Sequence, residues 1–364
     1  MKKYTPEKIF ILNDAKDYLI TETVLKNLPS VPVEFIADPK EISHIIEHAP
    51  DPIGESKKYL LLTKNKGGFL KYCPGTAQPY ICCGYRIANF YVNCNLDCTY
   101  CILQAYLNNP FIIVNVNIDD LADQIEEMVC GDKDRYFRIG TGELGDSLSL
   151  DHITEFTKHV NPLINKYDNL TIEYKTKSNN VGNLKKIDHR GKIVVSWSMN
   201  AEKIARSEDI GSATLDERLE AAAQCEKLGY KIGFHFDPII HYDGWQEGYE
   251  KTIDKIFNTI SDKNIAWVSL GCFRYMPDLK EIIEQRFADS KITHHEFILG
   301  LDKKMRYFKT LRIEMYSALY KHIRKYSDDA FVYLCMESPQ VWQRAFGFSP
   351  KNMKELSDWL DRRC

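Results

Sequence analysis

Short apolar segments alternate with helical stretches along most of the chain, and this alternation limits the possible folds more than any other feature. The apolar segments lie at residues 87–92, 137–139, 171–175, 193–198, 231–236 and 266–270. Helical stretches lie between them, at residues 118–129, 152–167, 212–227 and 245–260. Because strands that alternate with helices of this length form βα units, the pattern predicts an α/β fold with a parallel sheet. Six strands fit a partial (β/α)6 barrel, in which site residues lie at the C-terminal ends of the strands.

The chain of 364 residues is long enough for one large core with appended parts. We expect a small N-terminal α/β lobe over residues 1–85, the barrel over residues 86–290, and a C-terminal α/β extension over residues 291–364. The lobe contains apolar segments at residues 9–12, 33–36 and 59–63. The extension contains a further strand-like segment that starts at Val332.

Composition narrows the class of protein. A hydrophobic content of 44% and a charged content of 27% are ordinary for a globular protein. There is neither a run of about 18 apolar residues nor an apolar signal-peptide core, so we expect a cytoplasmic protein that does not contact membranes. In such a compartment the eleven cysteines are thiols or metal ligands. A net charge of −3 argues against a protein whose whole surface binds nucleic acid non-specifically, but it is compatible with a local basic groove.

Cys94, Cys98 and Cys101 form a C-x3-C-x2-C motif directly after the first barrel strand. Three thiolates can hold three corners of a [4Fe-4S] cluster and leave one iron open for a small molecule. This spacing is typical of the radical S-adenosylmethionine (SAM) enzymes, in which SAM binds the open iron and is cleaved to an adenosyl radical. A zinc knuckle is the alternative, but zinc usually takes four ligands and no second cysteine pair lies at the usual distance.

Polar residues follow the predicted strands. Gly142 and Glu143 come after the second strand, where glycine leaves room for SAM and the carboxylate accepts hydrogen bonds from its ammonium group. Lys177 follows the third strand and is a partner for the SAM carboxylate. Ser198 and Asn200 end the fourth and offer hydrogen bonds to ribose or methionine groups. The alternative is an ordinary strand-to-helix loop with an exposed lysine.

The later part of the chain offers weaker signals. His235 and Asp237 alternate onto one face of the fifth strand and indicate a site in the barrel lumen, although a lone strand histidine is more often structural. Residues 303–309 and 320–326 interleave basic with aromatic side chains, as a phosphate-tracking surface would, and a solvated helix face is equally compatible. Two interpretations are open for Cys73, Cys82 and Cys83: they form part of a second metal site, or they are buried thiols. The second interpretation is favoured.

Several stretches resemble spore photoproduct lyase and its relatives, the radical SAM DNA-repair lyases. The motif with its continuation Cys101-Ile102-Leu103-Gln104 is similar to the cysteine motif of that family. Further similar stretches follow in order: Pro110-Phe111-Ile112 to Asn117, Asp151-His152, Thr176-Lys177, Ser198-Met199-Asn200, residues 217–222, Pro238, and residues 244–249. The resemblance covers about residues 1–260.

This resemblance implies a partial (β/α)6 barrel, one [4Fe-4S] cluster on Cys94, Cys98 and Cys101, and bound SAM. It implies DNA carrying a thymine lesion as partner, with the lesion flipped so that the radical reaches a base carbon. In the family the radical takes hydrogen from C6 of the lesion, the bridge between the thymines breaks, and a cysteine thiol returns a hydrogen atom. A one-electron reductant such as flavodoxin or ferredoxin is also implied.

The resemblance fails at the residue that returns the hydrogen atom. The cysteine of the family aligns with Glu143, and a carboxylate cannot donate a hydrogen atom. The tyrosine after the third cluster cysteine is replaced by Ile102, although Tyr100 is kept. We therefore take Cys272 and Cys335, which lie at strand ends, as candidate donors, with Tyr100 and Glu143 as further candidate catalytic residues.

Two other functions remain open at this point. One is a radical SAM enzyme that modifies RNA, a peptide or a small molecule, since a fold does not determine a substrate. The other is a non-catalytic iron–sulfur protein. The open three-cysteine site and the polar residues at the strand ends argue against the second.

Overall fold

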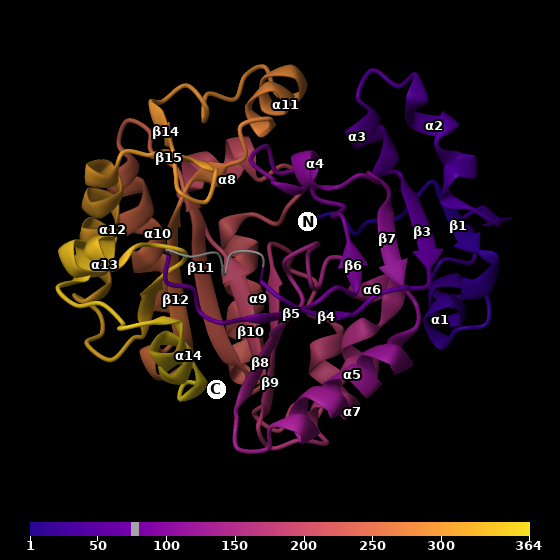
Figure 1. Ribbon diagram of the computed structural model, residues 1–364, viewed down its shortest axis with the longest axis horizontal. Coiled ribbons are helices and arrows are strands. Elements are labelled where there is room, and N and C mark those ends of the chain that lie inside the picture. Colours follow the sequence, from indigo (N-terminus) through magenta and orange to yellow (C-terminus); the bar gives the residue numbers. More distant parts are fainter. Residues whose placement is uncertain (74–79) are drawn as a thin grey trace.

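The structure, a computed structural model, describes residues 1–73 and 80–364 (Figure 1). Its largest sheet has eight strands and forms an open, curled half-barrel. In spatial order the strands are β16 (Val332–Leu334), β12 (Ile265–Cys272), β11 (Lys231–Ile239), β10 (Ile193–Ser198), β9 (Leu170–Thr176), β8 (Phe137–Gly140), β5 (Arg86–Ala88) and β4 (Leu70–Tyr72). Neighbouring strands from β5 to β16 pair in parallel, and β4 pairs antiparallel with β5. The predicted α/β fold with a partial parallel barrel is confirmed.

The N-terminal lobe is built on a second sheet of five strands. Its spatial order is β2 (Val33–Ile36), β1 (Lys8–Leu12), β3 (Tyr59–Thr63), β7 (Ile112–Asn115) and β6 (Tyr91–Val92). A small antiparallel sheet contains β13 (Arg274–Tyr275), β15 (Met305–Tyr307) and β14 (Phe297–Leu299). The expected boundaries at residues 86 and 291 do not coincide with the sheets, because β7 returns to the lobe while β4 and β16 extend the half-barrel.

Helices cover the outer face of the half-barrel, where α9 packs on β10 and β11, α12 on β12, and α7 on β9 (Figure 1). The α-helices are α1 (Leu19–Asn27), α2 (His44–Glu47), α3 (Pro52–Ser56), α4 (Leu103–Tyr106), α5 (Ile118–Gly131), α6 (Asp151–Thr154), α7 (Phe156–Ile164), α8 (Glu202–Glu208), α9 (Leu215–Lys227), α10 (Trp245–Thr259), α11 (Leu279–Arg286), α12 (Lys309–Ile323), α13 (Pro339–Phe346) and α14 (Met353–Asp361). Within the described ranges, none of them is both long and apolar enough to cross a membrane.

Two predicted elements are interrupted. The apolar run 87–92 is split into β5 and β6, which belong to different sheets, because the chain turns at residues 89–90 and the Phe90 ring stacks on Phe156 at 3.8 Å between centroids. The predicted helix 152–167 is broken at Glu155, whose φ of 51° is left-handed. The Asp151 carboxylate then accepts a hydrogen bond from the Thr157 amide at 2.9 Å and starts α7. Neither break is visible in the hydrophobic pattern.

Candidate active site

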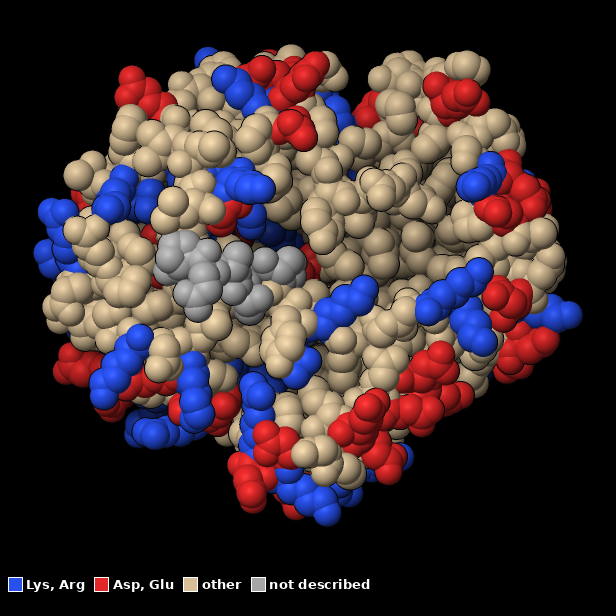
Figure 2. All heavy atoms as spheres, in the orientation of Figure 1, with Lys and Arg blue, Asp and Glu red and all other residues tan. Residues whose placement is uncertain are grey.

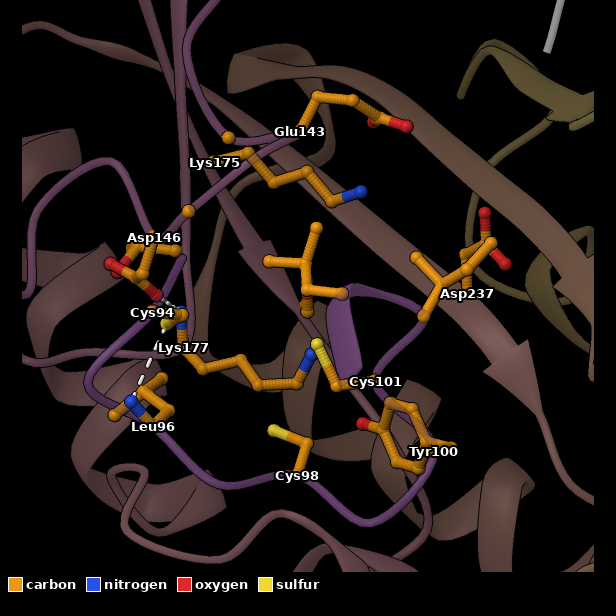
Figure 3. Close-up of a pocket in the computed structure, with 16 residues that line it drawn as sticks. Cys94, Leu96, Cys98, Tyr100, Cys101, Glu143, Asp146, Lys175, Lys177 and Asp237 are labelled. Carbon is orange, nitrogen blue, oxygen red and sulfur yellow. Dashed lines mark hydrogen bonds between the residues drawn. The ribbon is translucent and has the colours of Figure 1, made fainter. Parts of the chain in front are cut away.

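The C-terminal ends of β9, β10 and β11, the loop after β8 and the cysteine loop enclose a cavity of about 140 Å³ (Figure 3). The structure thus brings together residues that the sequence separates by more than a hundred positions. The predicted residues that line it are Cys94, Cys98, Tyr100, Cys101, Gly142, Glu143, Lys177 and Ser198. Lys175 and Asp237 line it as well. In Figure 3 the amine of Lys177 points toward the thiols of Cys98 and Cys101.

The cysteine loop is held in place by the turn that follows α8. The amides of Asp97 and Thr99 donate to the carbonyls of Ile210 and Glu208, each at 2.9 Å. The Asp97 carboxylate also pairs with Lys57 at 2.9 Å and with Arg286 at 3.0 Å. Because both the backbone and the side chains of the loop are tied to the scaffold, the three thiols are presented from a fixed backbone.

Tyr100 belongs to a buried network below the cavity. Its hydroxyl donates to Asp209, which forms an ion pair of 2.8 Å with the buried Arg218. Asn200 donates to the Tyr100 hydroxyl at 3.4 Å and accepts from Tyr249 at 2.6 Å. Asn200 is 1% exposed and does not line the cavity, so its predicted contact with SAM is replaced by a contact with Tyr100.

The donor set fits an iron–sulfur cluster. Burial raises the pKa of Cys94 to about 12 and raises that of Cys98 well above its usual value, so both thiols need a cationic partner to ionise. Among the described residues, no fourth cysteine lines the cavity. Nor, among the described residues, do three His, Cys, Asp or Glu side chains lie close enough together to hold a single metal ion.

Opposite the thiols, alternating charges surround the cavity (Figure 3). Although burial opposes it, the nearby carboxylates of Asp237 and Glu143 raise the pKa of Lys175. Arg274 holds Asp237 through two contacts of 3.1 Å, and its charge outweighs burial to lower the pKa of that carboxyl. Lys175 was missed in the sequence, but it lies near the end of β9, two residues before Lys177, so the spacing of two indicates that both side chains leave the chain on the same side.

The turn after β8 contains both a cavity residue and a structural one. A side chain at Gly142 would place its Cβ 2.8 Å from the Cβ of Lys175, so only glycine allows the turn to approach β9 this closely. Asp146 accepts from the amides of Ser149 at 2.8 Å and Lys177 at 2.7 Å. It therefore joins the turn to the end of β9.

The remaining predicted residues lie outside the cavity. Cys272 is 2% exposed, and its thiol lies 4.0 Å from the sulfur of Met315 on α12. Cys335 follows β16, and its sulfur accepts a hydrogen bond from Arg274 at 3.5 Å. His235 pairs with Glu173 at 2.7 Å deep in the half-barrel, as the structural alternative for this histidine implied.

Buried ion pairs interrupt both of the runs that mix basic with aromatic residues, 303–309 and 320–326. Arg306 is 2% exposed and pairs with Asp302 at 2.6 Å. His322 is also buried and pairs with Asp254 at 2.5 Å. Neither run therefore forms a continuous phosphate-tracking surface, because Arg306 and His322 are buried and held by carboxylates of the protein itself.

Three comparisons relate the chain to known proteins. The family model described as "Spore photoproduct lyase" matches residues 4–330. The curated spore photoproduct lyases of a Geobacillus species and of Bacillus subtilis are 28% and 27% identical over 59% and 60% of this chain. The chain spans only 62% and 63% of their lengths.

Solved structures give the same fold. A spore photoproduct lyase variant is similar with a TM-score of 0.83, 21% identity, and coverage of 92% of this chain and all of the other. A second variant, solved with bound SAM and a dinucleoside spore photoproduct, has a TM-score of 0.82 at 21% identity and the same coverage. These similarities confirm the half-barrel architecture.

Proposed function

This chain belongs to the spore photoproduct lyase family, and we propose that it is a radical SAM lyase that reverses a thymine-dimer-type lesion in DNA. One observation carries the proposal: three thiols spaced for an open cluster line the same cavity as Lys175, Lys177 and Glu143. A related enzyme was solved with SAM and a dinucleoside spore photoproduct, which supports the choice of cofactor and substrate.

Cys94, Cys98 and Cys101 would hold a [4Fe-4S] cluster. With SAM, that cluster supplies one electron and a radical able to take hydrogen from carbon. Glu143 accepts hydrogen bonds from the SAM amino group, and Lys177 pairs with its carboxylate. Ser198 offers a hydroxyl at the end of β10, and Tyr100 closes the cavity below. These groups bind and orient SAM, and the surrounding protein excludes bulk water.

We place the substrate at the open end of the half-barrel. Figure 2 shows a hollow in the middle of this face, with Lys and Arg side chains at its edge. Burial and the neighbouring charge of Arg274, which pairs with Asp237, lower the pKa of Lys304, so the cations of Lys304 and Arg274 are crowded together. A DNA phosphate would relieve this repulsion, and binding should weaken steeply with salt. We assign the electron supply to flavodoxin or ferredoxin, and the cytoplasmic location stays a prediction.

The test is an anaerobic reaction. The reconstituted, reduced protein is mixed with SAM and a dinucleoside spore photoproduct, and 5'-deoxyadenosine and thymine are measured together. Both products are expected. Formation of 5'-deoxyadenosine with an intact lesion would contradict the lesion as substrate and favour RNA, a peptide or a small molecule. Absence of both products from a cluster-loaded sample would favour a non-catalytic iron–sulfur protein.

A further inference from the structure

The lyase reaction needs a hydrogen atom for the product radical, and the cavity offers no obvious donor. No cysteine occurs between Cys130 and Cys225, so the loop after β8 contains none. In the described part of the chain, every thiol that lines the cavity belongs to the cluster motif. A cysteine S–H bond is weak enough to be broken by a carbon radical, whereas carboxylates and lysines have no such bond. The Tyr100 hydroxyl also lines the cavity, but its hydrogen is donated to the buried Asp209. We therefore look for the donor outside the SAM cavity.

A group of thiols lies beside the cavity, on the open side of the half-barrel. Ile81 and Glu337 form an antiparallel bridge, and the Ile81 amide donates to the Glu337 carbonyl at 2.9 Å. Cys83 and Cys335 each lie two residues from this bridge, and the nearby Cys83 is one of the groups that raise the pKa of Cys335. Cys82 adds side-chain hydrogen bonds to Cys73 and Cys83.

Cys335 is the member of this group that is tied to the cavity. Its amide donates to the Leu270 carbonyl at 2.9 Å. This places Cys335 just beyond β16, at the C-terminal ends of the parallel strands. Arg274 contacts both its sulfur, at 3.5 Å, and the cavity residue Asp237, at 3.1 Å. Cys335 is also only partly buried, while Cys82 is 2% exposed. Cys335 is thus separated from the cavity residue Asp237 only by the side chain of Arg274.

Cys335 and Cys83 differ in their protonation. Burial and the nearby Asp237 raise the pKa of Cys335, so it keeps its S–H bond at neutral pH. The hydrogen bond from Cys82 and the charge of Arg138 lower the pKa of Cys83 to about 7, so a large fraction is thiolate and has no hydrogen atom to give. Of these two neighbours, the one near the cavity is therefore the one that holds the hydrogen atom.

We propose that the thiol of Cys335 donates the hydrogen atom to the product radical. This inference rests on the proposed lyase function and names the donor that it requires. The S–H bond of Cys335 breaks, a C–H bond forms on the thymine methylene carbon, and a thiyl radical remains on Cys335. One electron from the flavodoxin or ferredoxin class of reductant, together with one proton from solvent, returns the thiyl radical to the thiol.

The experiment compares Cys335→Ser with Cys272→Ser. Serine keeps a hydrogen-bonding group beside Arg274, but its O–H bond is too strong to give up a hydrogen atom. Cys272 is the matched control, because its thiol ends the neighbouring strand and faces α12. With Cys335→Ser, 5'-deoxyadenosine should stay within about twofold of wild type while restored thymine falls at least about tenfold. Both products should be unchanged with Cys272→Ser.

A reaction of the unaltered protein in D2O provides a test that needs no variant. Thiols exchange with solvent, so restored thymine should carry one deuterium in its methyl group. An unlabelled methyl group would overturn thiol donation. Wild-type thymine yields from Cys335→Ser would overturn the assignment to this residue while leaving the lyase function intact.

Two further outcomes separate this inference from the function on which it rests. If the unaltered protein forms 5'-deoxyadenosine but no thymine, the lyase function fails and the donor assignment fails with it. If Cys335→Ser melts at the wild-type temperature but loses both products, Cys335 acts before hydrogen donation and the assignment is wrong.

Discussion

Lys175 shows how individual charges set the chemistry of the cavity. It lies between Glu143 and Asp237, whose negative charges keep it protonated despite burial. Lys177, two residues later, faces the thiols instead (Figure 3). The two lysines therefore serve different halves of the cavity, and a substitution of either should affect SAM binding through a different group.

We expect Lys175→Ala to weaken SAM binding about tenfold, because two carboxylates would face each other without their shared cation. Equilibrium dialysis of the cluster-loaded protein measures this directly. The matched control is Lys251→Ala, an exposed lysine that pairs with Glu247 on α10. Unchanged SAM affinity in Lys175→Ala would show that this lysine does not face the cofactor.

Tyr100→Phe tests whether the buried hydroxyl is structural or chemical. It removes the hydrogen bond to Asp209 and should lower the free energy of unfolding by about 1 kcal/mol, measured with urea. Asp209 keeps its ion pair with Arg218, so the fold and iron content should be retained. Loss of 5'-deoxyadenosine formation at full iron content would contradict a purely structural role and support a catalytic one.

At the scale of elements, one strand performs two tasks. β9 directs Lys175 to the cavity and Glu173 into the interior of the half-barrel, and Lys177 follows directly after its end. The buried Glu173 carboxylate accepts from Tyr85, Ser196 and His235. These partners belong to β10, β11 and the segment before β5, so one carboxylate joins several strands below the cavity. Although burial opposes ionisation, His235 lowers the pKa of Glu173 to about 2.

This shift predicts a pH-dependent contribution to stability. The folded pKa of Glu173 lies below its usual value of 4.5, so the ionised network stabilises the protein above about pH 4.5 and loses that contribution as the pH falls toward 2. Glu173→Gln should therefore cost about 3 kcal/mol at pH 7. In urea unfolding, its difference from wild type should shrink between pH 4.5 and pH 3.

Glu247→Gln, at an exposed pair on α10, is the control and should change the free energy of unfolding by less than about 0.5 kcal/mol. A Glu173→Gln difference that stays constant from pH 7 to pH 3 would show that the carboxyl is not ionised in the folded protein.

At the scale of the whole molecule, one arginine joins three distant segments. Arg286, at the end of α11, pairs with Asp51 at the start of α3 at 2.8 Å and with Asp97 of the cysteine loop at 3.0 Å. It thereby links the N-terminal lobe, the cysteine loop and the segment after β12. Figure 1 shows α3 and α11 on either side of the gap above the cysteine loop. Cluster retention should therefore depend on this contact.

Arg286→Ala should release iron to a chelator about tenfold faster than wild type, since residues that orient metal ligands commonly change metal affinity by that much. The control is Lys280→Ala on the same helix, whose exposed amine lies 3.8 Å from Glu284. Equal iron-release rates in both variants would contradict the role of Arg286 in holding the loop.

The sequence by itself determined the class of fold and the cluster motif. Strand and helix periodicities are local properties, so β10 was predicted to the residue and six other strands of the half-barrel in part. The thiol spacing is likewise local, as is the strand-end placement of Glu143 and Lys177. Local patterns do not reveal where an apolar run turns, which is why the run at residues 87–92 was read as one strand.

Tertiary structure decided which of these residues meet. It brought Lys175 and Asp237 to the cavity, and it moved Asn200 into the support of Tyr100. It also turned Cys272 toward α12 and placed Cys335 beside Arg274 and Cys83. The physical reason is that partners distant in sequence, such as Ile81 and Glu337, are joined only by long-range pairing. Spacing along the chain does not encode such contacts.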